Sequence, residues 1–321
     1  MKIAIMFPGY GSQYVGMGKE LYDDFRIMQE YFEEAANCLD INFVKLCFAS
    51  SDLELSKMSH AYPAIFLVSS SIYQILKEEG IVPDIVAGYN VGEFSAMHAA
   101  GGISFVDGLY LINKYLAFYE EFLSSEDISL IRISGIPSDT LKQICEQYST
   151  NETFAYVSIH SSPEDHVVAG HTSVVDQIID ALKSYEKTKV KTVGIEVGLH
   201  SPLMRPVFDS LKLYLEKIDF KDTEIPVLSS TELHPAKSGQ SLRAAVLDYI
   251  TTPILWDEVY DYLNEYDLIL EVGPGTKLAD VAKKHYPNKI ILSVNTKADI
   301  QKLKEILKAD KGKENNKTSE K

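Results

Sequence analysis

One short turn in the sequence has the residue pattern on which acyl chemistry can be built. The apolar run "DIVAGY" is typical of a buried strand, and "GEFSAMHAAGG" is typical of a helix, with Gly88–Gly92 between them. Such a turn with serine at its centre is a nucleophile elbow, which presents the serine hydroxyl to a substrate. The central residue here is Asn90. A carboxamide has no proton that a histidine can usefully remove, so Asn90 is not expected to form a covalent acyl-enzyme.

Asn90 is expected to be compatible with the backbone conformation of the elbow. Asparagine tolerates the left-handed conformation better than most residues other than glycine. Ser95, in the helix that follows, lies more than one turn beyond Asn90. We therefore consider Ser95 a poor substitute for the missing nucleophile.

Composition limits the classes of function. The 321 residues are 45% hydrophobic, which is enough for one or two domains with a real interior. The formal net charge of −15 argues against nucleic-acid binding, which needs a basic surface. The opening "MKIAIMFPGYG" is too short an apolar run for a signal peptide or a membrane span. Three cysteines without metal-like spacing suggest a reduced compartment, most simply the cytoplasm.

Strand and helix patterns alternate along the chain, which predicts an α/β fold with a mostly parallel sheet. The stretch 127–197 differs, because it reads strand, helix, strand, strand, helix, strand, with "KVKTVGIEV" as the last strand. This order predicts a ferredoxin-like small subdomain inserted into a large subdomain formed by residues 1–126 and 198–307. Residues 308–321 are almost without apolar side chains and are expected to be a disordered tail.

Six ordered segments carry a resemblance to a known family. They are "FPGYGSQYVGMGKEL", "YPAIFLVSSSIYQIL", "GYNVGEFSA", "VGLHSPLMRP", "TTPILW" and "LILEVGPGTKLADVAKK". In this order they resemble malonyl-CoA:acyl carrier protein transacylases and the acyltransferase domains of polyketide synthases, from about Met1 to Tyr286. The resemblance implies an α/β-hydrolase-like large subdomain and a role in fatty acid or polyketide biosynthesis. It also implies an acyl carrier protein or synthase component as partner. No cofactor is implied beyond an acyl-CoA or acyl-phosphopantetheine substrate.

The resemblance also implies roles for individual positions. The nucleophile position is Asn90 and the base that would serve it is His200. The backbone N–H groups of Tyr10 and Val91 are the implied oxyanion donors. The arginine that clamps malonate in the family aligns with Tyr115, although a slip of one residue would place Lys114 there. At the nucleophile, base and clamp positions, only the base, His200, is the residue type that the family uses.

Five positions that line or border the family's acyl site are tyrosine in this chain: Tyr10, Tyr62, Tyr89, Tyr115 and Tyr249. We interpret them as a changed pocket. Tyrosine is abundant in the chain, 19 of 321 residues, so compositional drift is an alternative explanation. A tyrosine offers a carboxylate one neutral O–H where arginine offers a charged fork, so selectivity for malonyl groups is expected to be lost.

Three functions remain open at this stage. The first is a pseudo-acyltransferase that binds a carrier protein or a synthase partner. The second is an acyl-thioester hydrolase in which His200 activates a water. The third is a working transacylase with an unrecognised nucleophile. Because carrier proteins are acidic, docking would need a local basic patch, for which the candidates are Lys187, Lys189, Lys191 and Arg205.

Overall fold

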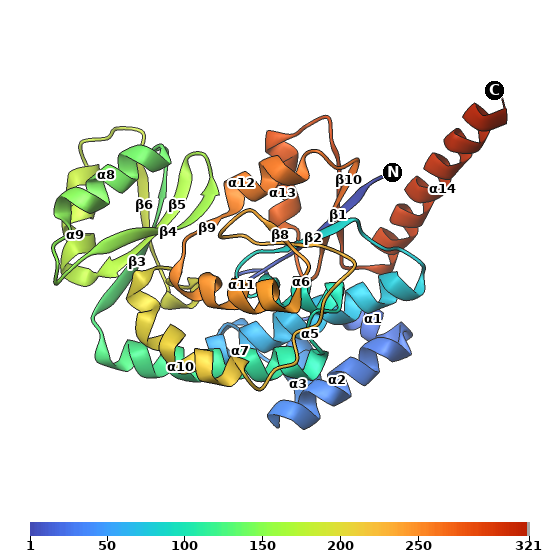
Figure 1. Ribbon diagram of the computed structural model, residues 1–321, viewed down its shortest axis with the longest axis horizontal. Helices are drawn as coiled ribbons and strands as arrows, with labels where there is room; N and C mark the ends of the chain where they lie inside the picture. The colour runs from blue at the N-terminus through green and yellow to red at the C-terminus, as the bar shows by residue number, and fades with distance from the viewer. Residues whose placement is uncertain (320–321) are drawn as a thin grey trace.

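The large subdomain is built on a six-stranded sheet. The computed structural model describes residues 1–319 and is shown in Figure 1. The strand order is β11-β10-β1-β2-β7-β8, and all neighbours are parallel except β7 and β8. The strands are β1 (Ile3–Phe7), β2 (Ile85–Gly88), β7 (Val227–Leu228), β8 (Pro235–Ala236), β10 (Leu268–Val272) and β11 (Ile290–Val294). Every residue of β1, β2 and β10 is buried, as expected when helices cover both faces of a parallel sheet.

The small subdomain is built on a second sheet, at the left of Figure 1. Its strands are β3 (Ile128–Ser134), β4 (Ala155–Ser162), β5 (Asp165–His171) and β6 (Lys189–Val193), in the antiparallel order β6-β3-β5-β4. This is the ferredoxin-like order. A fifth strand, β9 (Ile254–Leu255), pairs parallel with β4 and comes from a much later part of the chain. The predicted α/β fold class with a parallel sheet and two subdomains is confirmed.

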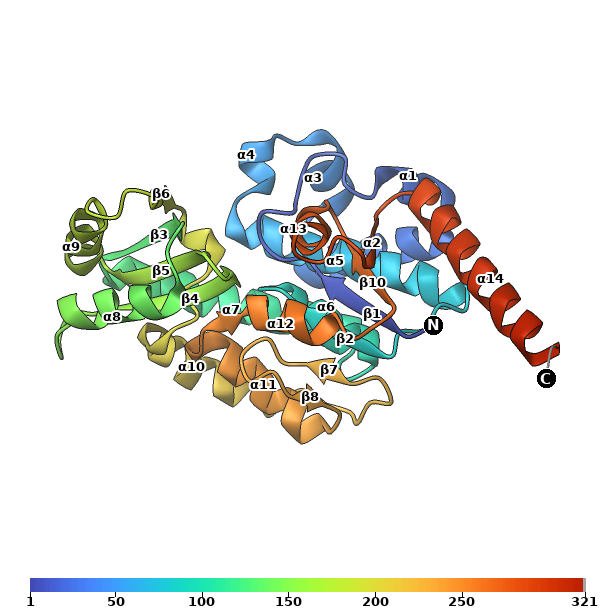
Figure 2. The same ribbon diagram turned by 90° about the horizontal axis from the view of Figure 1, so that it is seen from above.

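Helices surround both sheets (Figures 1 and 2). Those of the large subdomain are α1 (Lys19–Asp24), α2 (Arg26–Leu39), α3 (Phe43–Ala49), α4 (Asp52–Leu55), α5 (Met58–Glu78), α6 (Gly92–Ala100), α7 (Phe105–Ser125), α10 (Arg205–Leu215), α11 (Gly239–Thr251), α12 (Trp256–Leu263), α13 (Lys277–His285) and α14 (Lys297–Ser319). The small subdomain has α8 (Ser138–Tyr148) and α9 (Thr172–Leu182). Two short 3₁₀ turns, η1 (Ile195–Val197) and η2 (Pro202–Met204), lead back to the large subdomain.

Two expected elements differ in the structure. The strand expected over 189–197 ends at Val193, and the chain turns into η1 after Gly194. The tail expected to be disordered from residue 308 is helical as far as Ser319, and α14 projects from the body in both views. Lysine, which is frequent there, and glutamate favour helix even without an apolar face. The last two residues of the predicted tail lie outside the described part of the chain.

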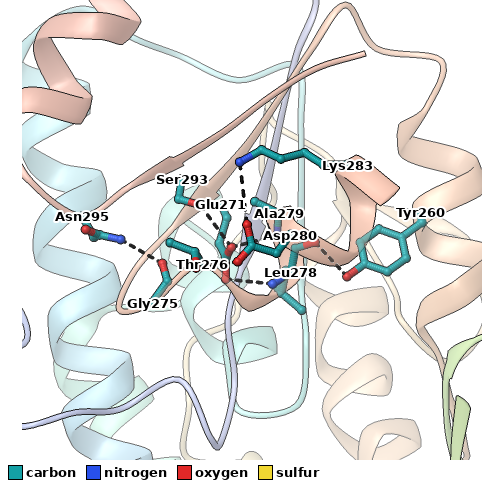
Figure 3. A network of polar contacts seen from close by, with 10 residues as sticks. All are labelled: Tyr260, Glu271, Gly275, Thr276, Leu278, Ala279, Asp280, Lys283, Ser293 and Asn295. Carbon is teal, nitrogen blue, oxygen red and sulfur yellow. Dashed lines mark hydrogen bonds and ion pairs between the residues drawn. The ribbon is translucent and has the colours of Figure 1, made fainter. Parts of the chain in front are cut away.

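The segment "EVGPG", at the end of β10, contains a buried carboxylate that bonds to the start of α13, shown in Figure 3. Glu271 accepts hydrogen bonds from the backbone N–H groups of Leu278 and Ala279, at 3.2 and 2.8 Å, at the start of α13. Burial raises the pKa of Glu271 to about 7 despite these donors. The segment therefore joins β10 to α13 as part of the scaffold.

Candidate active site

The elbow lies between β2 and α6, directly against the end of β1. Asn90 has a φ of 53°, the left-handed conformation that a sharp strand-to-helix turn requires. Its neighbours Gly88 and Gly92 have no room for a side chain. A Cβ on Gly92 would collide with the carbonyl group of Phe7, and one on Gly88 would collide with the backbone of α6. The two glycines thus let the elbow approach the sheet closely.

All hydrogen-bonding groups of the Asn90 carboxamide are engaged inside the protein. Its Oδ1 accepts from the backbone N–H of Tyr10 at 3.3 Å. Its Nδ2 donates to the carbonyl of Val197 at 3.0 Å and to Nε2 of His200 at 2.8 Å. The residue is only 1% exposed. The amide is therefore a fixed, buried connection between the elbow, the first turn of the chain and the segment that carries His200.

His200 is held as a neutral imidazole. Its Nδ1 lies 2.8 Å from the carbonyl oxygen of Tyr249, which can only accept, so Nδ1 carries the proton. Nε2 is then the acceptor for Asn90, which agrees with the orientation of the amide. Burial lowers the pKa of His200 to about 4, because a charged ring would lose its hydration. At neutral pH the ring is thus uncharged and a weak base.

Four of the five predicted tyrosines form a connected group of rings beside this pair. The ring centroids are 6.0 Å apart for Tyr10 and Tyr62, 6.4 Å for Tyr62 and Tyr115, and 5.8 Å for Tyr115 and Tyr249. Tyr249 also packs edge-on against His200, at 4.7 Å. Tyr62, Tyr115 and Tyr249 are at most 1% exposed. The cluster fills this side of the site with phenol rings.

The remaining predicted positions lie around this cluster. Tyr89 is directed away from it, packs edge-on against Trp256 at 5.2 Å and approaches Arg132 and Asp165 of the small subdomain. Val91 is buried and immediately precedes α6. The two candidates for the clamp position lie on different faces of α7. Tyr115 faces the cluster, whereas Lys114 lies over the rings of Tyr110 and Tyr214, toward α10.

The candidate basic residues for docking lie on two different elements. Lys189 and Lys191 are exposed on β6, the edge strand of the small subdomain, and Lys187 lies two residues before the strand. Arg205 instead begins α10 and pairs with Asp209, its Nε 3.0 Å from the carboxylate. The three lysines therefore form the candidate patch.

Two features of the site were not identified in the sequence. Tyr119, one turn after Tyr115 on α7, stacks on it at 5.7 Å and donates its hydroxyl to the carbonyl of Ile195 at 2.7 Å. Its i+4 spacing from Tyr115 was the available signal. Glu93, just beyond the elbow, is buried, and Ser230 donates to its carboxylate at 3.3 Å. Burial raises the pKa of Glu93 to about 8, so it is largely protonated at neutral pH.

Comparison with known proteins decides the family. The model of the acyl transferase domain matches residues 5–315. The chain belongs to the acyl transferase family. Curated members similar to it include the malonyl CoA-acyl carrier protein transacylase of Bacillus subtilis (strain 168), 30% identical over 285 residues that cover 88% of this chain and 90% of that protein. The corresponding transacylase of Escherichia coli (strain K12) is 28% identical, over 88% of this chain and 92% of that protein.

Solved structures in the acyl transferase family share the fold. The malonyl CoA-acyl carrier protein transacylase of Coxiella burnetii matches with a TM-score of 0.89 and 26% identity, covering 94% of this chain and 96% of that chain. A complex of a malonyl-transacylase with its type II polyketide synthase acyl-carrier protein matches with a TM-score of 0.88 and 26% identity, covering 93% and 97%. The resemblance predicted from six sequence segments is thereby confirmed.

Two further observations concern ligands and membranes. Among residues 1–319, no group of three His, Cys, Asp or Glu side chains is arranged to hold a metal ion. Over the same range, no helix combines the length and the apolar character that crossing a bilayer requires.

Proposed function

We propose that this acyl transferase family member binds an acyl carrier protein or a synthase partner without forming a covalent acyl-enzyme. The proposal rests on the residue at the centre of the elbow, Asn90, and on the hydrogen bonds of its side chain. Its amide is buried and bonded to Tyr10, Val197 and His200. A carboxamide in this position offers neither a hydroxyl nor a thiol to a thioester.

The surroundings of Asn90 support the same conclusion. Its Oδ1 accepts from the Tyr10 N–H, which the family resemblance assigns as an oxyanion donor, so the side chain occupies the place where a thioester oxygen would bind. Tyr115, at the assigned clamp position, is buried among other tyrosines and carries no charge. A malonate carboxylate would therefore lose its hydration without gaining a cation.

The hydrolase alternative has less support from the geometry. His200 would have to activate a water through Nε2, and that atom accepts a hydrogen bond from Asn90. Burial also lowers the pKa of His200 to about 4, far from the value near the working pH that general-base catalysis favours.

The proposed partner follows from the family and from the edge of the small subdomain. A structural relative is a malonyl-transacylase bound to its acyl-carrier protein. In this chain the exposed Lys189 and Lys191 lie on edge strand β6, whereas Arg132 on the neighbouring strand β3 is paired with Asp165. With Lys187, these two lysines form the surface on which we place an acidic carrier protein, despite the net charge of −15. The cytoplasm is the proposed location, in line with three free cysteines.

Two measurements test the proposal together. Incubation with malonyl-CoA followed by intact-protein mass measurement should show no malonyl adduct, while the Bacillus subtilis transacylase, treated in parallel, serves as the positive control. Calorimetric titration with phosphopantetheinylated carrier protein should show binding. An adduct of malonyl mass on this chain would overturn the absence of covalent transfer, and absence of carrier binding would overturn the proposed partner.

A further inference from the structure

The segment 194–198, which we call the strap, lies over the Asn90–His200 pair and is held by an unusual set of contacts. Three consecutive carbonyl groups of the strap each accept a hydrogen bond from a buried side chain. Ile195 accepts from the hydroxyl of Tyr119 at 2.7 Å, and Glu196 accepts from that of Tyr62 at 2.9 Å. Val197 accepts from the Asn90 amide at 3.0 Å. These bonds form a three-point latch.

The three donors come from three separate elements of the large subdomain. Tyr62 is on α5, Asn90 is in the elbow and Tyr119 is on α7. Each donor is at most 1% exposed. If the strap moved away, each donor would lose its hydrogen-bond acceptor where little water can replace it, which costs free energy. The latch is therefore built into the core, while the strap comes to it from the small subdomain.

Besides the latch, the strap has limited packing: Ile195 and Val197 contact the main core with part of their surface, and Gly198 is buried. The side chains of Ile195, Glu196 and Val197 are all partly exposed, and Gly194 is exposed. The strap forms a single 3₁₀ turn, whose hydrogen bonds have poor geometry. At its far end Gly198 has a φ of 98°, a conformation that glycine adopts freely. Segments with few buried apolar contacts open more readily than the core around them.

The closed strap covers the reactive edge of His200. A Cβ placed on Gly198 would run into Nε2 of His200 and would lie 3.0 Å from Nδ2 of Asn90, so the backbone sits directly on the pair. On its outer side the strap borders a surface hollow of about 450 Å³ lined by Ile195 and Glu196 and by the ends of α5 and α7. There is thus free space next to the strap, and His200 is not among the residues that line it.

We propose that the strap is an internal gate that opens as a unit and controls access to His200, and that Tyr62, Tyr119 and Asn90 are the residues that latch it shut. This assigns Asn90 a positive role as a latch at the centre of the elbow. It also assigns a role to Tyr119, which lies outside the positions implied by the family resemblance. The inference does not depend on carrier binding.

Hydrogen exchange of the strap amides measures the opening directly. The N–H groups of Val197 and Gly198 are bonded within the turn and should be protected while the gate is closed. Tyr62→Phe and Tyr119→Phe each remove one latch bond with little change in volume. Each should speed exchange of these amides by between about twofold and tenfold, and the double variant by roughly the product. Tyr115→Phe is the matched control, since its buried hydroxyl makes no hydrogen bond of good geometry. It should exchange like the wild type.

Chemical labelling of His200 gives a second readout. Diethyl pyrocarbonate acylates neutral imidazole, and mass measurement of the tryptic peptide with His200 reports how often Nε2 is reached. Labelling should rise in the two latch variants and not in Tyr115→Phe. A folded double variant with wild-type exchange and labelling would overturn the proposal.

The wild-type protein gives an independent test, in which exchange of the strap amides is measured over a urea series. Strap exchange that follows global unfolding would also overturn the proposal, whereas exchange insensitive to low urea supports a local gate.

Discussion

At position 90 the carboxamide makes contacts that a serine hydroxyl cannot make together. A hydroxyl has one proton to donate, whereas the Asn90 amide donates both to Val197 and to His200 and accepts from Tyr10 on its oxygen. Replacing it by serine would therefore recreate a serine–histidine pair and at the same time remove a connection to the strap. A nucleophile and the hydrogen bond to the strap therefore require different residues at position 90.

Repair of the nucleophile alone is expected to fail. Asn90→Ser should give no malonyl transfer to a phosphopantetheinylated carrier protein above background, because Tyr115 supplies no cation and the tyrosines fill the site. The missing clamp alone should weaken malonyl binding by roughly one to two orders of magnitude. Radiolabelled malonyl transfer by Asn90→Ser and by Asn90→Ser/Tyr115→Arg tests this. Robust turnover of the single variant would show that the pocket is intact and would favour a working transacylase.

The buried acid Glu93 predicts a pH dependence of stability. Its pKa is raised to about 8 in the folded protein, so the folded state holds a proton that the unfolded chain has already lost. Stability is therefore fully present below the ordinary glutamate pKa and falls as the pH rises toward about 8, by up to about 1.4 kcal/mol per pH unit. The lowered pKa values of His200 and His160, both about 4, act in the opposite direction, but only below their ordinary value of 6.5.

Glu93→Gln should remove most of this dependence. Urea unfolding between about pH 7 and pH 8 should show a falling free energy of unfolding for the wild type and a distinctly shallower fall for the variant, whose remaining slope comes from Glu271 with its pKa raised to about 7. Glu216→Gln, at the exposed C-cap position of α10, is the control and should keep the wild-type slope. Equal slopes in Glu93→Gln and wild type would mean that Glu93 is ionised in the folded state.

Among the elements, the elbow depends on how closely α6 approaches β1. Gly92→Ala would drive a methyl group into the carbonyl of Phe7, and the obstacle is backbone that cannot move aside. We expect a loss of about 3 kcal/mol or more in the free energy of unfolding, measured with urea. Gly80→Ala is the control. Its Cβ would meet nothing within 4 Å, so only the cost of its positive φ should appear, about 1 kcal/mol. Equal losses in the two variants would contradict the close approach.

Much of this architecture could be predicted from local patterns, and the exceptions have tertiary causes. The elbow, the alternating elements and the ferredoxin-like order follow from short-range periodicity. The end of β6 at Val193 does not, because apolar residues continue to Val197, and the chain leaves the strand where Tyr62 and Tyr119 bind its carbonyls. The inward or outward direction of a tyrosine likewise depends on packing partners, as Tyr89 against Trp256 shows.

For the whole molecule, the strongly acidic composition makes the position of the few clustered cations important. Lys189→Glu/Lys191→Glu should weaken carrier binding by about tenfold or more, because like charges across an interface repel. The control variant Lys45→Glu/Lys212→Glu makes the same change in net charge at exposed positions on α3 and α10 and should bind like the wild type. Calorimetric titration measures both, and equal weakening by the two pairs would show that only net charge matters.

The short path along the chain from β6 to His200 makes the molecule a candidate for mechanical coupling. Lys191 on β6 is three residues from Gly194, the first residue of the strap, and no loop separates them. If a partner binds this strand more tightly when the strap is open, binding at the outer surface and opening of the strap form one linked equilibrium. Such linkage is reciprocal. Loosening the latch from within, as in Tyr62→Phe/Tyr119→Phe, would then tighten the hold of a partner on Lys189 and Lys191, although neither tyrosine touches it.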